Sequence, residues 1–175
     1  MTKRRLFVDM DGVLTKWKKI RVYEDLYERG FFLSMMPQTN VVEAVRLLTQ
    51  DDGFEVYVLS ALLADSPYAE SEKNKWLDEY LPEVKENHRI FVSCGTSKSS
   101  GVPGGIRKSD LLLDDYSVNL WDWDKYAVGI KLVNDVNNTV GTWMGHSRDA
   151  VSYDWSPENI VEEIKLIVMK GENKL

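Results

Sequence analysis

An apolar run that stops at two aspartates constrains this chain more than any other feature. Residues 6–8 (Leu-Phe-Val) are followed by Asp9, Met10, Asp11 and Gly12. A run this short is typical of a strand buried on both faces, and carboxylates cannot stay inside such a strand without a compensating partner. The two aspartates are therefore expected at the C-terminal mouth of the strand, which is the edge where open α/β sheets bind ligands.

Composition and charge narrow the class of protein. The 175 residues suit one domain, and a net charge of -6 argues against a nucleic-acid polymer or an anionic membrane as partner. A small substrate that carries phosphate remains compatible if the site supplies a cation. The single cysteine, Cys94, excludes an intrachain disulfide and is expected as a small buried residue. With no apolar stretch of signal-peptide or membrane-spanning length, we expect a soluble, cytoplasmic protein.

Short apolar runs alternate with stretches of helical periodicity. The runs predict strands at about 6–8, 54–59, 89–92, 111–113 and 127–133. The periodic stretches predict helices at about 40–52 and 65–81, a helix through Leu120 and Trp123, and a final helix that starts at 156 and runs through Val168. This order predicts a three-layer, Rossmann-like α/β sandwich with a mainly parallel five-stranded sheet. We expect one domain over 1–175, with a small helical cap insert at about 15–38. The polar region 134–155 is expected to be loop, with a short hairpin at most.

Polar residues follow the apolar runs at four places. They are Asp9 and Asp11, Ser60, Lys98 in a glycine- and serine-rich loop, and the pair Asp114 and Asp115. In a parallel sheet these ends share one edge, so the side chains should converge. Crowded carboxylates need a cation, and their hard oxygens suit Mg²⁺, while a hydroxyl and an ammonium can donate to a phosphate. Isolated aspartates are more often turn formers or helix caps, but the ordered set favours a site.

These residues carry a resemblance to a known family. The four motifs are Asp9-Met10-Asp11-Gly12-Val13, Val58-Leu59-Ser60-Ala61, a lysine after the third strand, and Leu112-Leu113-Asp114-Asp115-Tyr116. Together they resemble the motifs of the haloacid dehalogenase superfamily of phosphohydrolases. The insert, with Gly30-Phe31-Phe32 before Met36-Pro37, is similar to that of the 5'(3')-deoxyribonucleotidase branch. The resemblance runs from about residue 5 to residue 133, and its strength is that four short motifs occur in order.

The resemblance implies a role for each motif residue. Asp9 would be the nucleophile that forms an aspartyl-phosphate, and Asp11 would be the general acid and base. Ser60 and Lys98, with Ala61 beside the serine, would bind the transferring phosphoryl group. The Mg²⁺ ligands would be Asp9, Asp114, the backbone carbonyl of Asp11, and Asp115 either directly or through a water.

The third motif departs from the family pattern, because a long loop separates Lys98 from Asp114. Lys108 is the competing lysine, but it lies just before the fourth strand and so near the opposite edge of the sheet. Phe31 and Phe32 suit either the cap core or a pocket wall that touches a nucleobase.

The implied activity is that of a magnesium-dependent phosphatase for nucleoside monophosphates, most simply deoxyribonucleotides. A phosphatase for a sugar phosphate or another small metabolite is a second reading, favoured by the glycine-rich loop. A non-catalytic, phosphate-binding regulatory domain is a third, although a receiver-type switch needs an aspartate where the third strand ends in Ser93-Cys94. A small cap leaves the pocket partly open, and the second subunit of a homodimer could close it.

Overall fold

A parallel sheet lies at the centre of the molecule. The computed structural model describes residues 3–137 and 149–172. Within them the strands are β1 (Arg4–Val8), β2 (Phe54–Leu62), β3 (Arg89–Ser93), β4 (Leu111–Asp114), β5 (Val128–Val133) and β6 (Ala150–Ser152). Their order is β3-β2-β1-β4-β5-β6, and every neighbouring pair is parallel. The predicted α/β class is confirmed, and all C-terminal strand ends share one edge.

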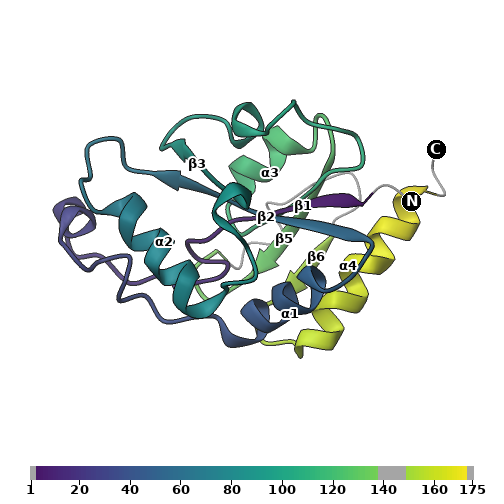
Figure 1. Cartoon of the computed structure of the whole chain (residues 1–175), viewed down its shortest axis with the longest axis horizontal. Helices are drawn as coiled ribbons and strands as arrows, with labels where there is room; N and C mark the ends of the chain where they lie inside the picture. Colours follow the sequence, from purple (N-terminus) through teal and green to yellow (C-terminus); the bar gives the residue numbers. More distant parts are fainter. Residues whose placement is uncertain (1–2, 138–148, 173–175) are drawn as a thin grey trace.

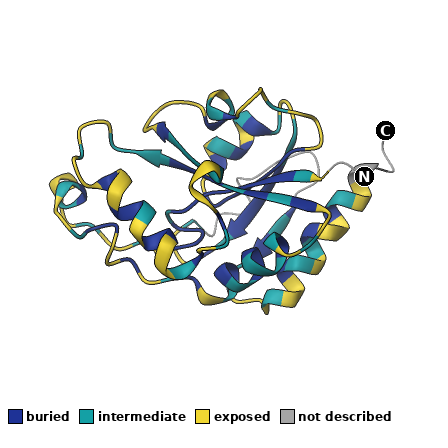
Figure 2. Cartoon of the chain, in the orientation of Figure 1, coloured by how far each residue is buried: buried dark blue, intermediate teal, exposed yellow. Residues whose placement is uncertain are grey.

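Helices cover both faces of the sheet (Figure 1). They are α1 (Thr39–Thr49), α2 (Ala69–Tyr80), α3 (Ser117–Trp123) and α4 (Pro157–Glu172), with short 3-10 helices η1 (Tyr23–Tyr27), η2 (Glu86–His88) and η3 (Lys98–Gly101). Side chains of β1 alternate between two cores. Leu6 and Val8 pack with residues of α1, α2 and α4, whereas Phe7 packs with Leu120 and Trp123 of α3. Figure 2 shows the buried sheet between helices whose outer surfaces are exposed, which is the predicted three-layer arrangement.

The sheet has six strands where the sequence predicted five. The additional strand, β6, falls in the polar region that we expected to be loop. It pairs with β5 in the register Lys131↔Ala150 to Val133↔Ser152. Only its central residue, Val151, is buried, so three residues at the edge of the sheet carry almost no apolar signal. Residues 138–148 of the same region lie outside the described part of the chain.

The insert between β1 and α1 is less helical than predicted. Its only helix among the described residues is the single 3-10 element η1. The segment is instead held by a small apolar cluster and by α2. The cluster contains Leu26, Phe31, Phe32, Met35 and Ala69. The buried carboxylate of Glu72 on α2 accepts hydrogen bonds from the backbone N–H groups of Gly30, Phe32 and Leu33. Bonds to a charged acceptor contribute roughly 1.5–3 kcal/mol each, so side-chain anchoring replaces helix formation here.

The long connection from β3 to β4 crosses the α3 face of the sheet without an α-helix. Near its start, η3 packs against β2 and β3, and Val102 joins the core beneath α3. Near its end, Arg5 of β1 is 4% exposed and pairs with Asp110 through two nitrogens, at 3.0 and 2.5 Å. The same guanidinium donates to the carbonyls of Pro103 and Gly105. The connection is therefore fixed at both edges of the sheet.

Two further predictions concern Cys94 and membrane-spanning segments. Cys94, expected to be buried, is an exposed free thiol, because it lies one residue beyond the end of β3. Among the described residues, no helix combines the length and the apolar character needed to cross a membrane.

Candidate active site

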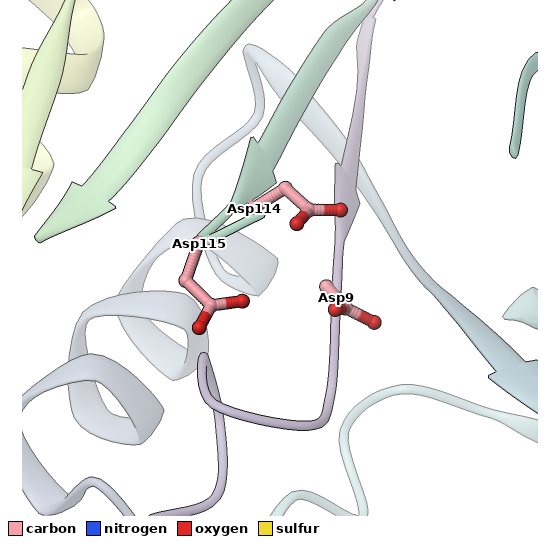
Figure 3. A group of neighbouring side chains, drawn as sticks. All are labelled: Asp9, Asp114 and Asp115. Carbon is pink, nitrogen blue, oxygen red and sulfur yellow. The ribbon is translucent and has the colours of Figure 1, made fainter. Parts of the chain in front are cut away.

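Three aspartates meet at the C-terminal edge of the sheet (Figure 3). Asp9 follows β1 directly, Asp114 is the last residue of β4, and Asp115 follows it. Each offers a carboxylate oxygen, and these oxygens lie within 4.8 Å of one another. All three residues are buried. A cluster of this kind can hold a metal ion, and its all-oxygen donor set suits a hard divalent cation.

Lys98 supplies a positive charge to this cluster. Its Nζ lies 2.8 Å from Oδ1 of Asp9 and 2.7 Å from Oδ2 of Asp114, and the side chain is 4% exposed. Although burial opposes it, the two carboxylates raise the pKa of Lys98 above its ordinary value, so the ammonium stays charged. Lys108 is exposed and precedes β4, at the opposite edge of the sheet. The structure brings Lys98 to the carboxylates and leaves Lys108 away from them.

A second lysine, which was not predicted from the sequence, occupies the other side of the site. Lys73 of α2 is fully buried, and its Nζ lies 2.6 Å from Oδ2 of Asp11. The same ammonium donates to Oγ of Ser60 at 3.0 Å and to the carbonyl of Ala61 at 2.7 Å. The sequence did contain one signal for it, the position of Lys73 in the helical repeat. Lys73 lies three and four residues before Trp76 and Leu77, on the apolar face of the helix.

Ser60 reaches the site from inside a strand. We predicted that β2 would end at residue 59, but it continues to Leu62 by pairing with β3, in the register Ser60↔Phe91 and Leu62↔Ser93. Ser60 is fully buried. Its hydroxyl thus needs a polar partner, and Lys73 provides one.

Burial dominates the electrostatics of the acids. It raises the pKa of Asp11; the Lys73 ammonium opposes this effect, and the Asp9 carboxylate reinforces it. Burial also raises the pKa of Asp114 to about 7, against the opposing effect of Lys98. One oxygen of Asp11, Oδ1, is buried without a hydrogen-bond partner. Both acids therefore retain a proton more readily than an ordinary aspartate, and the cluster to which Asp114 belongs favours a cation.

Asparagines and a buried lysine hold the acidic pair in place. The Nδ2 groups of Asn134 and Asn137 each donate to Oδ2 of Asp115 at 2.8 Å. Lys131 of β5 is fully buried, and it donates to the carbonyl of Asp115 and to Oγ of Ser117. Burial raises the pKa of Asp115 even so. Partners of this kind orient carboxylate ligands at metal sites.

The turn after β1 requires glycine. Gly12 has a φ of +83°, and a Cβ there would lie 2.5 Å from Oδ2 of Asp115. The carbonyl of Gly12 also accepts from Asn134 at 2.7 Å. The turn can thus pass directly over the acidic pair, which places Asp9 and Asp11 beside it.

A cavity of about 240 Å³ opens over these groups. Its walls include Asp9, Asp11, Lys98 and Asp115, and they also include Trp17 from the insert and Tyr116. We name it the acid-lined cavity.

Phe31 and Phe32, considered for a pocket wall, do not line the acid-lined cavity. Each is 3% exposed, and their rings pack edge to face, 5.1 Å between centroids, in the core of the insert. Phe32 also lies beneath the Lys73 ammonium, 4.8 Å from ring centroid to Nζ.

Comparison with known proteins places this chain in a family. Two relatives from Staphylococcus aureus, strains Mu50 and MRSA252, each named "Putative 5'(3')-deoxyribonucleotidase", are 28% identical over 135 residues. The aligned part is 77% of this chain and 64% of each relative, so the chain spans less than two thirds of their length. The family model described as "5' nucleotidase, deoxy (Pyrimidine), cytosolic type C protein" matches residues 15–152. That match confirms the resemblance found in the motifs, and the chain belongs to this nucleotidase family.

Proposed function

We propose that this chain is a magnesium-dependent phosphatase that hydrolyses nucleoside monophosphates, most simply deoxyribonucleotides, through a phospho-aspartate. The observation that carries the proposal is the division of labour between two neighbouring acids. Asp9 faces Lys98 and the acidic pair, whereas Asp11 is paired with Lys73, which also donates to Ser60. Family membership and the names of the relatives support a nucleotide as the substrate class.

Asp9 is the proposed nucleophile. Its carboxylate oxygen attacks the phosphorus atom, and the bond from phosphorus to the ester oxygen breaks. The leaving oxygen takes a proton from Asp11. In the second half of the reaction Asp11 takes a proton from water, the water oxygen attacks the phosphorus of the aspartyl-phosphate, and the bond to Asp9 breaks. A carboxylate nucleophile divides one difficult displacement into two easier ones.

Asp11 is suited to the acid and base role by its surroundings. Burial raises its pKa, so the carboxyl group holds a proton more readily than an ordinary aspartate and can pass that proton to an alkoxide. The ion pair with Lys73 fixes which way the carboxyl group points. This restraint keeps Asp11 apart from Asp9, even though only one residue separates them.

Cations and donors around Asp9 suit a phosphoryl group. We infer that Lys98, Ser60 and the segment at Ala61 bind the transferring oxygens. Ala61 and Lys98 line the acid-lined cavity. The Lys73 ammonium that binds the Ser60 hydroxyl also binds Asp11 and the Ala61 carbonyl, and both of these residues line the cavity. Fixed charges aimed at phosphoryl oxygens account for most of the catalysis in phosphoryl transfer.

The acidic cluster fits Mg²⁺. Asp9, Asp114 and Asp115 present three buried oxygens at close range, and Mg²⁺ takes a few carboxylates while keeping waters. Bound there, the ion would offset the charge of the carboxylates and of the incoming phosphate.

We also infer a reducing, cytoplasmic setting, because the only thiol, Cys94, is exposed and free.

A substrate panel tests the proposal. Purified protein with Mg²⁺ is incubated with deoxyribonucleotides, the matching ribonucleotides, sugar phosphates and an aryl phosphate, and released phosphate is measured with and without a chelator. We expect chelator-sensitive release, fastest from a nucleotide. If no phosphate were released from any of these compounds, the proposed phosphatase activity would be excluded. The small acid-lined cavity gives a sugar phosphatase as the second candidate, and preference for a sugar phosphate would replace the nucleotide as substrate.

A further inference from the structure

A second cavity lies beside the acid-lined cavity, between the loop after β3 and helix α3. Its volume is about 690 Å³. We propose that this cavity, which we name the α3 cleft, receives the nucleobase of the substrate. The inference rests on the proposed function, and it adds the direction in which the bound substrate extends away from the acidic centre.

The α3 cleft is continuous with the acid-lined cavity. Ala61, Lys98, Tyr116 and Asn119 line both. A phosphoryl group held at Lys98 is thus already at the entrance of the cleft. The acid-lined cavity alone is smaller than ordinary ligand pockets, which enclose about 300–1,000 Å³, whereas the two joined cavities fall within that range. A substrate larger than its phosphoryl group needs the additional space.

Aromatic and apolar side chains form one wall of the cleft. Tyr116, Val118 and Trp121 are 52%, 48% and 47% exposed, although α3 buries Leu120 and Trp123 against the sheet. Three large exposed side chains on one short helix and the residue before it are unexpected unless something covers them. Aromatic faces at the edge of a ligand cavity are the surfaces on which nucleobases stack.

The opposite wall of the cleft is polar and is hydrogen-bonded to the first wall. Oγ of Ser99 donates to Oδ2 of Asp122 at 2.9 Å, and Ser97 bonds to the same oxygen. These bonds join η3 and its N-terminal residue to α3, so the width of the cleft is set before a ligand enters. Ser97 and the Lys125 ammonium also line it, and they offer polar groups to the edge of a heterocycle.

The insert offers a poorer surface for a base. Phe31 and Phe32 are buried against each other, and their faces are not available to a ligand. Among the described residues of the insert, Trp17 is the one aromatic residue that lines the acid-lined cavity. The aromatic surface next to the acidic centre is therefore concentrated on α3.

A matched pair of ligands isolates the contribution of the base. Binding of a deoxyribonucleoside 5'-monophosphate and of deoxyribose 5-phosphate, which lacks the base, is measured by calorimetry with Mg²⁺ in Asp9→Asn protein, so that turnover does not interfere. The Kd of deoxyribose 5-phosphate divided by the Kd of the deoxyribonucleotide reports the contribution of the base alone. Adding Trp121→Ala is expected to reduce this ratio at least about fivefold, the lower end of the effect of removing a stacking ring.

Two further variants make the result decisive. Trp155→Ala removes a tryptophan of similar exposure that lines neither cavity, and it should leave the ratio unchanged. Trp17→Ala tests the alternative direction: a fall in the ratio for Trp17→Ala, with none for Trp121→Ala, would overturn the inference while the proposed function stands. If the wild-type protein with Mg²⁺ released no phosphate from the deoxyribonucleotide, the proposed function would fail and the inference with it.

Discussion

The ammonium of Lys73 lies 2.6 Å from a carboxylate oxygen of Asp11, and this ion pair joins helix α2 to the turn after β1. The lysine is fully buried, and the aspartate side chain is 20% exposed. A pair in this position holds the proposed acid in one orientation. It also couples the insert to the site, since the adjacent Glu72 binds backbone amides of the insert.

Replacing Lys73 tests that restraint. Lys73→Met leaves Asp11 without its partner in a buried setting, and we expect kcat to fall roughly 10²- to 10³-fold, as for other lost preorganised charges. Lys75→Met, on the exposed face of the same helix, should retain kcat within about twofold. Steady-state kinetics on both variants, with circular dichroism to establish folding, gives the comparison. Turnover near the wild-type rate in folded Lys73→Met would refute the role.

The two competing lysines of the third motif can be separated in the same way. Lys98→Met removes the cation that bridges Asp9 and Asp114, so we expect at least about 10²-fold loss of kcat. Lys108→Met alters an exposed residue at the other edge of the sheet and should behave as wild type. The reverse pattern of kcat values would assign the motif to Lys108.

The nucleophile is tested by an almost isosteric change. Asp9→Asn keeps the shape of the side chain but removes its negative charge, so turnover should be abolished while the far-ultraviolet circular dichroism spectrum is unchanged. Acid quenching of the wild type during turnover of a phosphate-labelled substrate should trap label on the protein, and the variant should trap none. Label on Asp9→Asn protein would point to another residue.

The acidic cluster predicts how stability depends on pH and Mg²⁺. Because burial raises the pKa of Asp114 to about 7, the folded state binds more protons than the unfolded state between about pH 4 and 7. The free energy of unfolding of metal-free protein should therefore fall as pH rises through this window. Mg²⁺ needs the deprotonated carboxylates, so it should raise Tm more at pH 8 than at pH 5. Thermal denaturation with Mg²⁺ or chelator at both values measures this, and an equal or larger shift at pH 5 would contradict it.

Gly101 tests whether the position of Lys98 depends on close packing of η3. A Cβ at residue 101 would collide with Cγ1 of Val92 on β3, which would push the 3-10 helix outward. A displacement of about 1 Å can cost roughly 10²-fold in rate, and we expect a loss of that order for Gly101→Ala. Gly104→Ala meets no atom within 4 Å, but it has a φ of +71°, so it should cost about 1 kcal/mol of stability with little loss of kcat. Equal kcat values for the two variants would exclude the packing argument.

The sequence was most informative where apolar runs meet acids. The alternation of strands and helices was sufficient for the α/β class, and the positions of Asp9, Asp114 and Asp115 at strand ends predicted their convergence. Both are consequences of local patterns: a buried strand excludes carboxylates, and parallel strands end at one edge.

Features set by tertiary contacts were not predictable in this way. Strand β6 exists because β5 offers it a partner, and Ser60 lies inside β2 because β3 extends the pairing. Lys73 was missed because a lysine on a helix is normally solvated, and only the packing of α2 against the site buries it. The insert lacks an α-helix because Glu72, distant in sequence, satisfies its amides.

The fixed ends of the β3 to β4 connection have a consequence for how the protein responds to heating. Arg5 secures one end and η3 the other, but the backbone hydrogen bonds within the crossover are confined to short turns. Segments of this kind open locally at a lower free energy than the sheet beneath them. Because Lys98 belongs to this crossover, loss of the proposed activity is expected to precede melting of the sheet, and the temperature range of that activity is set by the least regular segment.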